Sequence, residues 1–273
     1  MKLFAYGDSW TEGVGGNINE EKTTEVPEER TIIRHKYCWP KHLSDLLKCE
    51  FQNDGVGGFC NHVIFDSICS RLKNKIIGKD DFVVIMWSSS LRDNLPFFPK
   101  DNNFNLWGKR YKNKRFLYRY LFEKDSDSNF EYNRIEKNFR DFYVTDLFTN
   151  TYYDIVNQNY ILYLQFMFKG MGIRYLFCDA FDGMISSDII EEVDNTRHID
   201  KNRYWGFKDK TFADFLIDTK RSDVWEDGNY WTENTAGKHP NKNGYKLIAD
   251  ELYSFILKNG LLEKASIPNS YII

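Results

Sequence analysis

A serine follows the first apolar run of the chain. The run Leu3–Tyr6 ends at a glycine and an aspartate, and Ser9 comes next, in the stretch GDSWTEG. At the end of a strand and near the start of a helix, a serine is accessible to a substrate. Because its hydroxyl is a weak nucleophile at neutral pH, attack on a carbonyl would require a general base nearby.

The candidate bases are the histidines of the chain. Five are present: His35, His42, His62, His198 and His239. His239 differs from the others because it lies in a loop directly before a helix that begins with proline, in GKHPNKNGYKLIAD. A lone serine or histidine is more often a capping or solvated residue. Together, in these contexts, Ser9 and His239 favour a nucleophile and its base.

Hydrophobic patterning predicts the elements that would position this pair. Short apolar runs predict a first strand at residues 2–6 and buried strands at 81–87 and 173–178, and residues 49–53 are interpreted as a short second strand. Helical spacing predicts helices from Trp39, through Ile64–Ile76, over about 137–169, at 212–217 and after Pro240. The polar stretch Asn17–Arg30 is interpreted as a loop, and residues 95–135 and 181–236 as irregular insertions.

The alternation of strands and helices predicts a mostly parallel sheet with helices on both faces. In such sheets, functional sites form beyond the carboxyl ends of the strands. Unusual loops follow three of the predicted strands, after Tyr6, Asn53 and Trp87. This convergence predicts a site at that edge of the sheet.

Composition narrows the functional classes. With 273 residues, 42% of them hydrophobic, the chain can form one large α/β domain or two small ones. The net charge of −3 argues against a nucleic-acid partner. An odd number of cysteines, five, favours a reducing compartment. We expect no signal peptide, because the charged Asp8 and Glu12 come too early for an apolar segment, and no membrane span, because no apolar run approaches ~18 residues.

Three ordered blocks of the sequence resemble the GDSL, or SGNH, hydrolases. They are the opening GDSWTEG, the glycine turn NDGVGG at residues 53–58, and the final block HPNKNGYKLIAD. A Trp-Pro helix between the first two is also common in that family. The resemblance implies a single domain over residues 1–273 with a three-layer, flavodoxin-like α/β/α fold and a mostly parallel five-stranded sheet. It covers the first ~90 residues and residues 235–257.

The resemblance also implies roles for individual residues. Ser9 would be the nucleophile and His239 the base that later protonates the leaving group. The backbone N–H groups of Ser9 and Gly58 would hold the oxyanion. The family's third donor is an asparagine, and the aligned position here is Ser90, whose hydroxyl can still donate one hydrogen bond.

A second departure from the family concerns the acid that orients the histidine. The family's aspartate position, three residues before His239, is Ala236 here. The nearest upstream acids are Glu233, Asp227 and Glu226, of which we prefer Glu233, and a Ser–His dyad stays open. The stretch SSSLRD after the third strand resembles phage-type relatives. Arg92 is therefore expected to contact substrate, with a surface salt bridge as an equal alternative, and Asp8, beside Ser9, is also expected to contact substrate.

The sequence thus predicts a serine esterase without cofactor or metal, in the cytoplasm or associated with a virion. The preferred substrate is an O-acetyl group on a carbohydrate, because sugars stack on aromatics, which make up 17% of the chain. A catalytically weakened binding module and an acyltransferase that uses the same serine are the alternatives. A zinc site at His35, Cys38, His42 and Cys49 is disfavoured, because those residues fall on predicted structural elements. The basic, aromatic stretch 107–122 is interpreted as packing on the domain.

Overall fold

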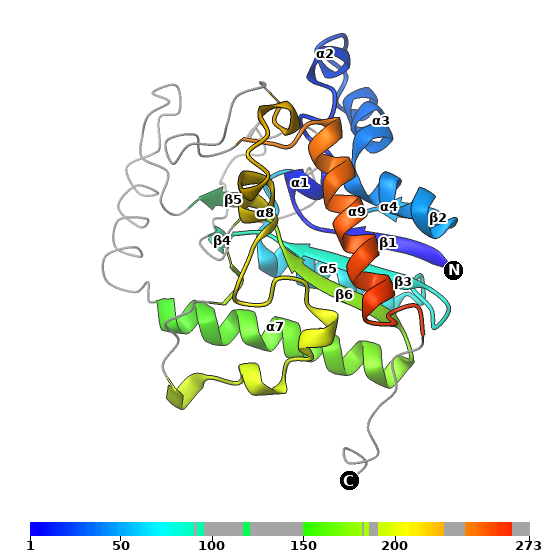
Figure 1. Cartoon of the computed structure of the whole chain (residues 1–273). Coiled ribbons are helices and arrows are strands. Elements are labelled where there is room, and N and C mark those ends of the chain that lie inside the picture. Colours follow the sequence, from blue (N-terminus) through cyan, green and yellow to red (C-terminus); the bar gives the residue numbers. More distant parts are fainter. Residues whose placement is uncertain are drawn as a thin grey trace.

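The centre of the molecule is a parallel sheet with helices on both faces (Figure 1). The computed structural model describes residues 1–89, 92–95, 117–120, 150–181, 183–185, 191–226 and 238–263. The sheet contains β1 (Lys2–Tyr6), β2 (Glu50–Asn53), β3 (Phe82–Trp87) and β6 (Arg174–Asp179), in the order β2-β1-β3-β6. The predicted α/β class is confirmed. The described residues contain four of the five strands implied by the family resemblance.

Successive side chains of β1, β3 and β6 enter two separate cores. On one face, Leu3 and Ala5 of β1 pack with α4 (Trp39–Leu47) and α9 (Lys242–Lys258). On the other, Phe4 and Tyr6 pack with α5 (Asn61–Lys73) and α7 (Asn150–Met171). This alternation follows from the period of two along a strand and produces the three layers visible in Figure 1.

The order of the strands places a switch point beside β1. The chain runs from β1 to its neighbour β2 and then crosses to the other side of β1 to form β3. Connections on the two sides of β1 therefore lead away from each other, which leaves a crevice outside the carboxyl ends of β1 and β3. Ser9 follows β1 at this position.

The predicted loop at Asn17–Arg30 is wrong, because part of it is helical. The structure has α2 at Ile18–Glu21 and α3 at Pro27–Tyr37. Helix α3 buries none of its side chains, so it lacks the apolar stripe by which sequence patterning recognises a helix. Its start is marked instead by Pro27 and by two acids in the first turn.

Helix α5 is shorter than its apolar spacing predicts. It ends at Lys73, and Ile76 lies beyond it, exposed, while the next residue, Ile77, is buried. In α9 the predicted stripe is confirmed: Tyr245 and Ile248, together with two further apolar residues of the same stripe, are fully buried.

The remaining described elements are short and lie mostly in the predicted insertions. They are α1 (Ser9–Glu12), β4 (Arg92–Leu95) paired antiparallel with β5 (Leu117–Tyr120), η3 (Glu191–Val193), η4 (Thr196–His198), η5 (Lys201–Arg203), α8 (Phe212–Asp218) and η6 (Ser222–Val224). Most of the predicted insertion 95–135, residues 137–149 of the predicted helix and residues 182, 186–190 and 227–236 lie outside the described residues. Among the described helices, none has the length and apolar character needed to cross a bilayer.

The start of α9 is fixed by Asn241, two residues after His239. Its side-chain oxygen accepts hydrogen bonds from the backbone N–H groups of Asn243 and Gly244. Its amide nitrogen donates to the carbonyl oxygens of Asp223 and Trp225, at 2.8 Å each. One side chain thus caps the helix and ties the segment after His239 to η6.

Replacing Asn241 separates these two contributions. We expect Asn241→Ala to lower the free energy of unfolding by about 1–2 kcal/mol, because both the cap and the two donated hydrogen bonds are lost. Asn241→Ser keeps an oxygen for the cap and should recover part of that loss. Urea unfolding followed by circular dichroism measures both. Equal stability of the alanine variant and the wild type would contradict the capping role.

Candidate active site

The turn after β1 has no room for a larger residue at its first position. A Cβ on Gly7 would lie 2.6 Å from the carbonyl oxygen of Met86 in β3, well inside a van der Waals contact. The chain then enters α1, where the Asp8 carboxylate accepts the backbone N–H of Trp10 at 3.0 Å and caps the helix. Ser9 is the first residue of this short helix, at the switch point of the sheet.

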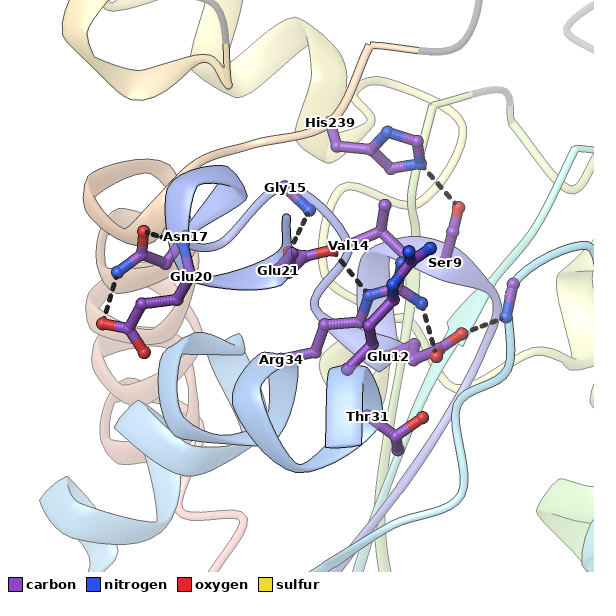
Figure 2. Close-up of polar contacts among 12 residues, drawn as sticks. Ser9, Glu12, Val14, Gly15, Asn17, Glu20, Glu21, Thr31, Arg34 and His239 are labelled. Atoms are coloured by element: carbon purple, nitrogen blue, oxygen red, sulfur yellow. Dashed lines mark hydrogen bonds and ion pairs between the residues drawn. The ribbon is translucent and has the colours of Figure 1, made fainter. Parts of the chain in front are cut away.

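Ser9 and His239 lie in direct contact, although 230 residues separate them in the chain. His239 Nε2 is 3.0 Å from Ser9 Oγ, as Figure 2 shows. That distance is a hydrogen bond, and it is within the reach a general base requires. Both side chains are largely shielded from solvent: Ser9 is 8% exposed and the His239 side chain 19%.

Glu226 lies on the far side of the imidazole ring. Its Oε2 is 3.6 Å from His239 Nδ1, which is within ion-pair range but longer than a hydrogen bond. The two residues are also linked through their backbones: the Glu226 N–H donates to the His239 carbonyl oxygen at 3.1 Å, beside a bridge between Trp225 and Pro240. Glu226 is one of the three acids that the sequence suggests. The preferred acid, Glu233, lies outside the described residues.

The glycine turn after β2 lies against Ser9. A Cβ on Gly57 would be 3.6 Å from Ser9 Cβ. The next residue, Gly58, is exposed and has a φ of +82°, a conformation that favours glycine. Within the described part of the chain, the N–H groups of Ser9 and Gly58 have no hydrogen-bond partner. Two backbone donors without a described partner therefore lie in the Ser9 turn and in the glycine turn that borders it.

The end of β3 is hydrogen-bonded to the turn after β1, which contains Asp8 and Ser9. Ser88 Oγ donates to the second oxygen of Asp8 at 2.9 Å, and Ser88 N–H donates to Asn61 Oδ1 at 2.9 Å. The Asn61 amide donates back to the carbonyl oxygens of Ser88 and Ser89. Asn61, at the start of α5, is a residue that sequence reasoning missed. Ser90, the predicted third donor, lies outside the described residues.

The substrate contact predicted for Asp8 is not supported. Its side chain is fully buried, and its two oxygens accept hydrogen bonds from Trp10 and Ser88. The carboxylate therefore joins the ends of β1 and β3 rather than facing a ligand. Arg92 is the first residue of β4, paired with Tyr120 of β5, and only its backbone is described.

Aromatic rings support the turn from behind. The Trp10 ring packs edge-on against Trp225 at a centroid distance of 6.2 Å, and against Phe181 at 5.8 Å. Trp225 directly precedes Glu226, so the residue after Ser9 packs against the residue before Glu226. Trp10 and Trp225 are both about 1% exposed, so their rings belong to the core and leave no face for a ligand.

The described cysteines are unlike nucleophiles. Burial raises the pKa of the Cys38 thiol to about 12 and raises that of Cys178 well above its ordinary value. Burial also raises the pKa of Cys49 and Cys69, which are half-buried. Since the thiolate is the reactive form, the raised pKa of each of these four thiols is the opposite of what a catalytic cysteine needs. Among the described residues, no group of three or more His, Cys, Asp or Glu side chains is arranged to hold a metal.

The burial of these thiols predicts how fast each cysteine is alkylated in the folded protein. At pH 8, a thiol with a pKa of about 12 is ionised in only about one part in ten thousand, so iodoacetamide should leave Cys38 and Cys178 unmodified in the folded protein. The half-buried Cys49 and Cys69 should react slowly. Peptide mass mapping, before and after unfolding in guanidinium chloride, measures each site. Rapid modification of Cys38 in the folded state would contradict the burial described here.

The described structure is an α/β fold with a doubly wound parallel sheet, and a Ser–His pair lies at the switch point of that sheet. By its sequence, the chain belongs to a family of unknown function (DUF6071), whose model matches residues 18–268. A solved structure described as a "putative lipolytic protein of G-D-S-L family" from Desulfitobacterium hafniense DCB-2 is similar at 14% identity and a TM-score of 0.42, covering 93% of this chain and 98% of that one. No curated protein sequence matches the chain.

Proposed function

We propose that the protein is a carboxylic ester hydrolase that forms an acyl-enzyme on Ser9. The observation that carries the proposal is the 3.0 Å contact between Ser9 Oγ and His239 Nε2 at the switch point of the sheet. Glu226 near His239 Nδ1 adds a group that can favour the tautomer with a proton on Nδ1. In that tautomer Nε2 is free to accept the serine proton, as a base must.

The reaction follows from these positions. As Ser9 Oγ attacks the ester carbonyl, His239 Nε2 takes the hydroxyl proton, and the carbonyl oxygen becomes an oxyanion. The N–H groups of Ser9 and Gly58 are the proposed donors to that oxyanion, with Ser90 as a third. When the intermediate collapses, the C–O bond to the alcohol breaks, and His239 returns the proton to the departing alkoxide. A water molecule, deprotonated by His239, then attacks the acyl carbon and releases the acid and free Ser9.

The proposed substrate is a small acyl ester, of which an O-acetyl group on a carbohydrate is the preferred case. Support for the carbohydrate part comes from the aromatic-rich composition alone, because the rings nearest Ser9 are buried. Arg92 is a proposed contact for an anionic group of the substrate. An acyltransferase would share every step up to the acyl-enzyme and differ only in the acceptor that removes the acyl group.

Covalent labelling tests the nucleophile. A fluorophosphonate probe should label the wild-type protein at one site per chain, and Ser9→Ala should abolish labelling because the attacking oxygen is gone. His239→Ala should slow labelling strongly, since the serine loses its base. Ser254→Ala is the control: Ser254 is a serine of α9 whose hydroxyl donates to Asp250, and its removal should leave labelling unchanged. Intact-protein mass spectrometry measures the stoichiometry.

The outcome of labelling separates the functional classes. A folded wild-type protein that takes up no probe would count against a hydrolase and for a binding module. Labelling that depends on Ser9, combined with transfer of acetyl from p-nitrophenyl acetate to an added sugar in preference to water, would identify a transferase. Product analysis by mass spectrometry distinguishes transfer from hydrolysis.

A matched pair of variants tests which acid supports the histidine. We expect Glu226→Gln to lower kcat for p-nitrophenyl acetate by about 10²-fold, because the amide can no longer stabilise the imidazolium that forms on His239. Glu233→Gln should behave like the wild type. Both variants remove one carboxylate at constant side-chain size, so each is the other's control. A loss confined to Glu233→Gln would assign the orienting role to Glu233 instead.

A further inference from the structure

Three charged side chains meet behind the Ser9 turn. Glu12 of α1 and Glu21 of α2 are both buried, at 4% and 7% exposure, and Arg34 of α3 lies between them. Arg34 Nη1 donates to Glu12 Oε1 and Arg34 Nε to Glu21 Oε2, each at 2.8 Å (Figure 2). One guanidinium therefore bridges two carboxylates, a geometry that its planar fork of donors permits.

The second oxygen of each carboxylate accepts a backbone N–H from a glycine. Glu12 Oε2 accepts from Gly57 at 2.6 Å. Glu21 Oε1 accepts from Gly15 at 3.0 Å. Each acid thus has one oxygen on Arg34 and the other on the backbone of a loop. The network is continuous from Gly57 through Glu12, Arg34 and Glu21 to Gly15.

The two glycines touch the two sides of the site. Gly57 lies against Ser9 and directly precedes Gly58, the proposed oxyanion donor. Gly15 lies on the other side: a Cβ there would be 2.8 Å from Glu226 Oε2 and 2.9 Å from His239 Cβ. The backbone at Gly15 therefore borders the histidine and its neighbouring acid, while the backbone at Gly57 borders the nucleophile.

The three charges hold one another in place, because separating any one of them from its partners is energetically costly. Burial opposes the charge on Arg34, but the carboxylates of Glu12 and Glu21 hold its pKa above the ordinary value. Removing one member of such a set leaves an uncompensated buried charge on its neighbours. The remaining groups must then move or draw in water, and the backbone N–H groups that they hold move with them.

We propose that Glu12, Arg34 and Glu21 are positioning residues of the reaction, which fix the oxyanion turn and the histidine relative to Ser9. This inference rests on the proposed hydrolase function. Glu12 acts through Gly57 on the donor at Gly58, and Glu21 acts through Gly15 on His239 and Glu226. None of the three takes part in the chemistry of the ester itself.

The two arms of the network are not equally indispensable. The loop that contains Gly15 is also held from α9, because the Tyr245 hydroxyl donates to the Val14 carbonyl oxygen at 2.7 Å and the Lys242 N–H to that of Gly16 at 2.9 Å. The Gly57 N–H has Glu12 as its partner in the described structure. We therefore expect the Glu12 arm to matter more for the rate than the Glu21 arm.

Steady-state kinetics with p-nitrophenyl acetate test the proposal. Glu12→Ala should lower kcat by about 10–100-fold with KM changed by less than about twofold, because a donor displaced by about 1 Å affects the transition state more than substrate binding. Glu12→Gln, which keeps an oxygen for the Gly57 N–H, should recover part of the rate. Glu21→Ala should lose less than Glu12→Ala. Arg34→Lys should also lose rate, since an ammonium cannot bridge both acids with the same fork.

The control removes an ion pair away from the site. Asp200 contacts Lys169 of α7 at 2.9 Å, so Asp200→Asn breaks a half-buried pair without touching the Ser9 turn. Its kcat should equal that of the wild type at temperatures below its unfolding transition. If Glu12→Ala does not fold, Glu12→Gln and Arg34→Lys provide the same comparison.

A second readout does not depend on activity. In protein labelled with ¹⁵N-glycine, the Gly57 amide proton should resonate downfield because it donates to a carboxylate, and Glu12→Ala should shift it upfield. Glu21→Ala should do the same to the Gly15 amide. If the network only stabilised the fold, breaking it would lower the unfolding temperature of the variants but leave the kcat and KM of the folded protein unchanged.

The outcomes separate the inference from the function on which it rests. Hydrolysis that depends on Ser9, together with wild-type kcat in Glu12→Ala and Arg34→Lys, would overturn the positioning network alone. A wild-type protein without Ser9-dependent hydrolysis would overturn the hydrolase function and the network's role in it together. If the Glu12 variants lose kcat while the chemical shift of the Gly57 amide proton stays as in the wild type, the proposed route through Gly57 is also overturned.

Discussion

The arrangement of the site depends on the close approach of β1 and β3 at their carboxyl ends. Gly7 lies so near the carbonyl oxygen of Met86 that a Cβ would be 2.6 Å from it, and the Asp8 carboxylate then links the turn to Ser88. Because the turn is bound to β3 in this way, it cannot swing away from the sheet. Ser9 is held at the switch point, and His239 approaches it from a segment anchored by Asn241.

Much of this could be predicted from the sequence, because the signals involved are local. Buried parallel strands appear as continuous apolar runs, which is why the β3 segment Phe82–Trp87 is evident without coordinates. The stripe of α9 follows from helical spacing alone. Ser9 and His239 can also be predicted as a pair, since Ser9 closely follows an apolar strand and His239 closely precedes an amphipathic helix.

The features that the sequence did not reveal all depend on contacts between distant segments. Helix α3 is recognisable only weakly from its residues, because Arg34 and the acids it contacts stabilise it through charge rather than through a buried apolar stripe. Glu226 could not be ranked above Glu233 by distance along the chain. Its place beside His239 arises from the backbone pairing of Trp225 with Pro240, which no spacing of residue types encodes.

The two departures from the GDSL pattern have different physical consequences. The position three residues before His239 is Ala236, and the acid beside the imidazole is instead Glu226, whose Oε2 lies 3.6 Å from Nδ1. That contact is longer than a hydrogen bond, so it supports the imidazolium less than a buried hydrogen bond would. Orientation of the ring would then depend more on packing, and the backbone at Gly15, held by Glu21, is so near that an added Cβ would lie 2.9 Å from His239 Cβ. In the proposed mechanism, the acid at Glu226 and the backbone held by Glu21 would therefore share the task of orienting His239.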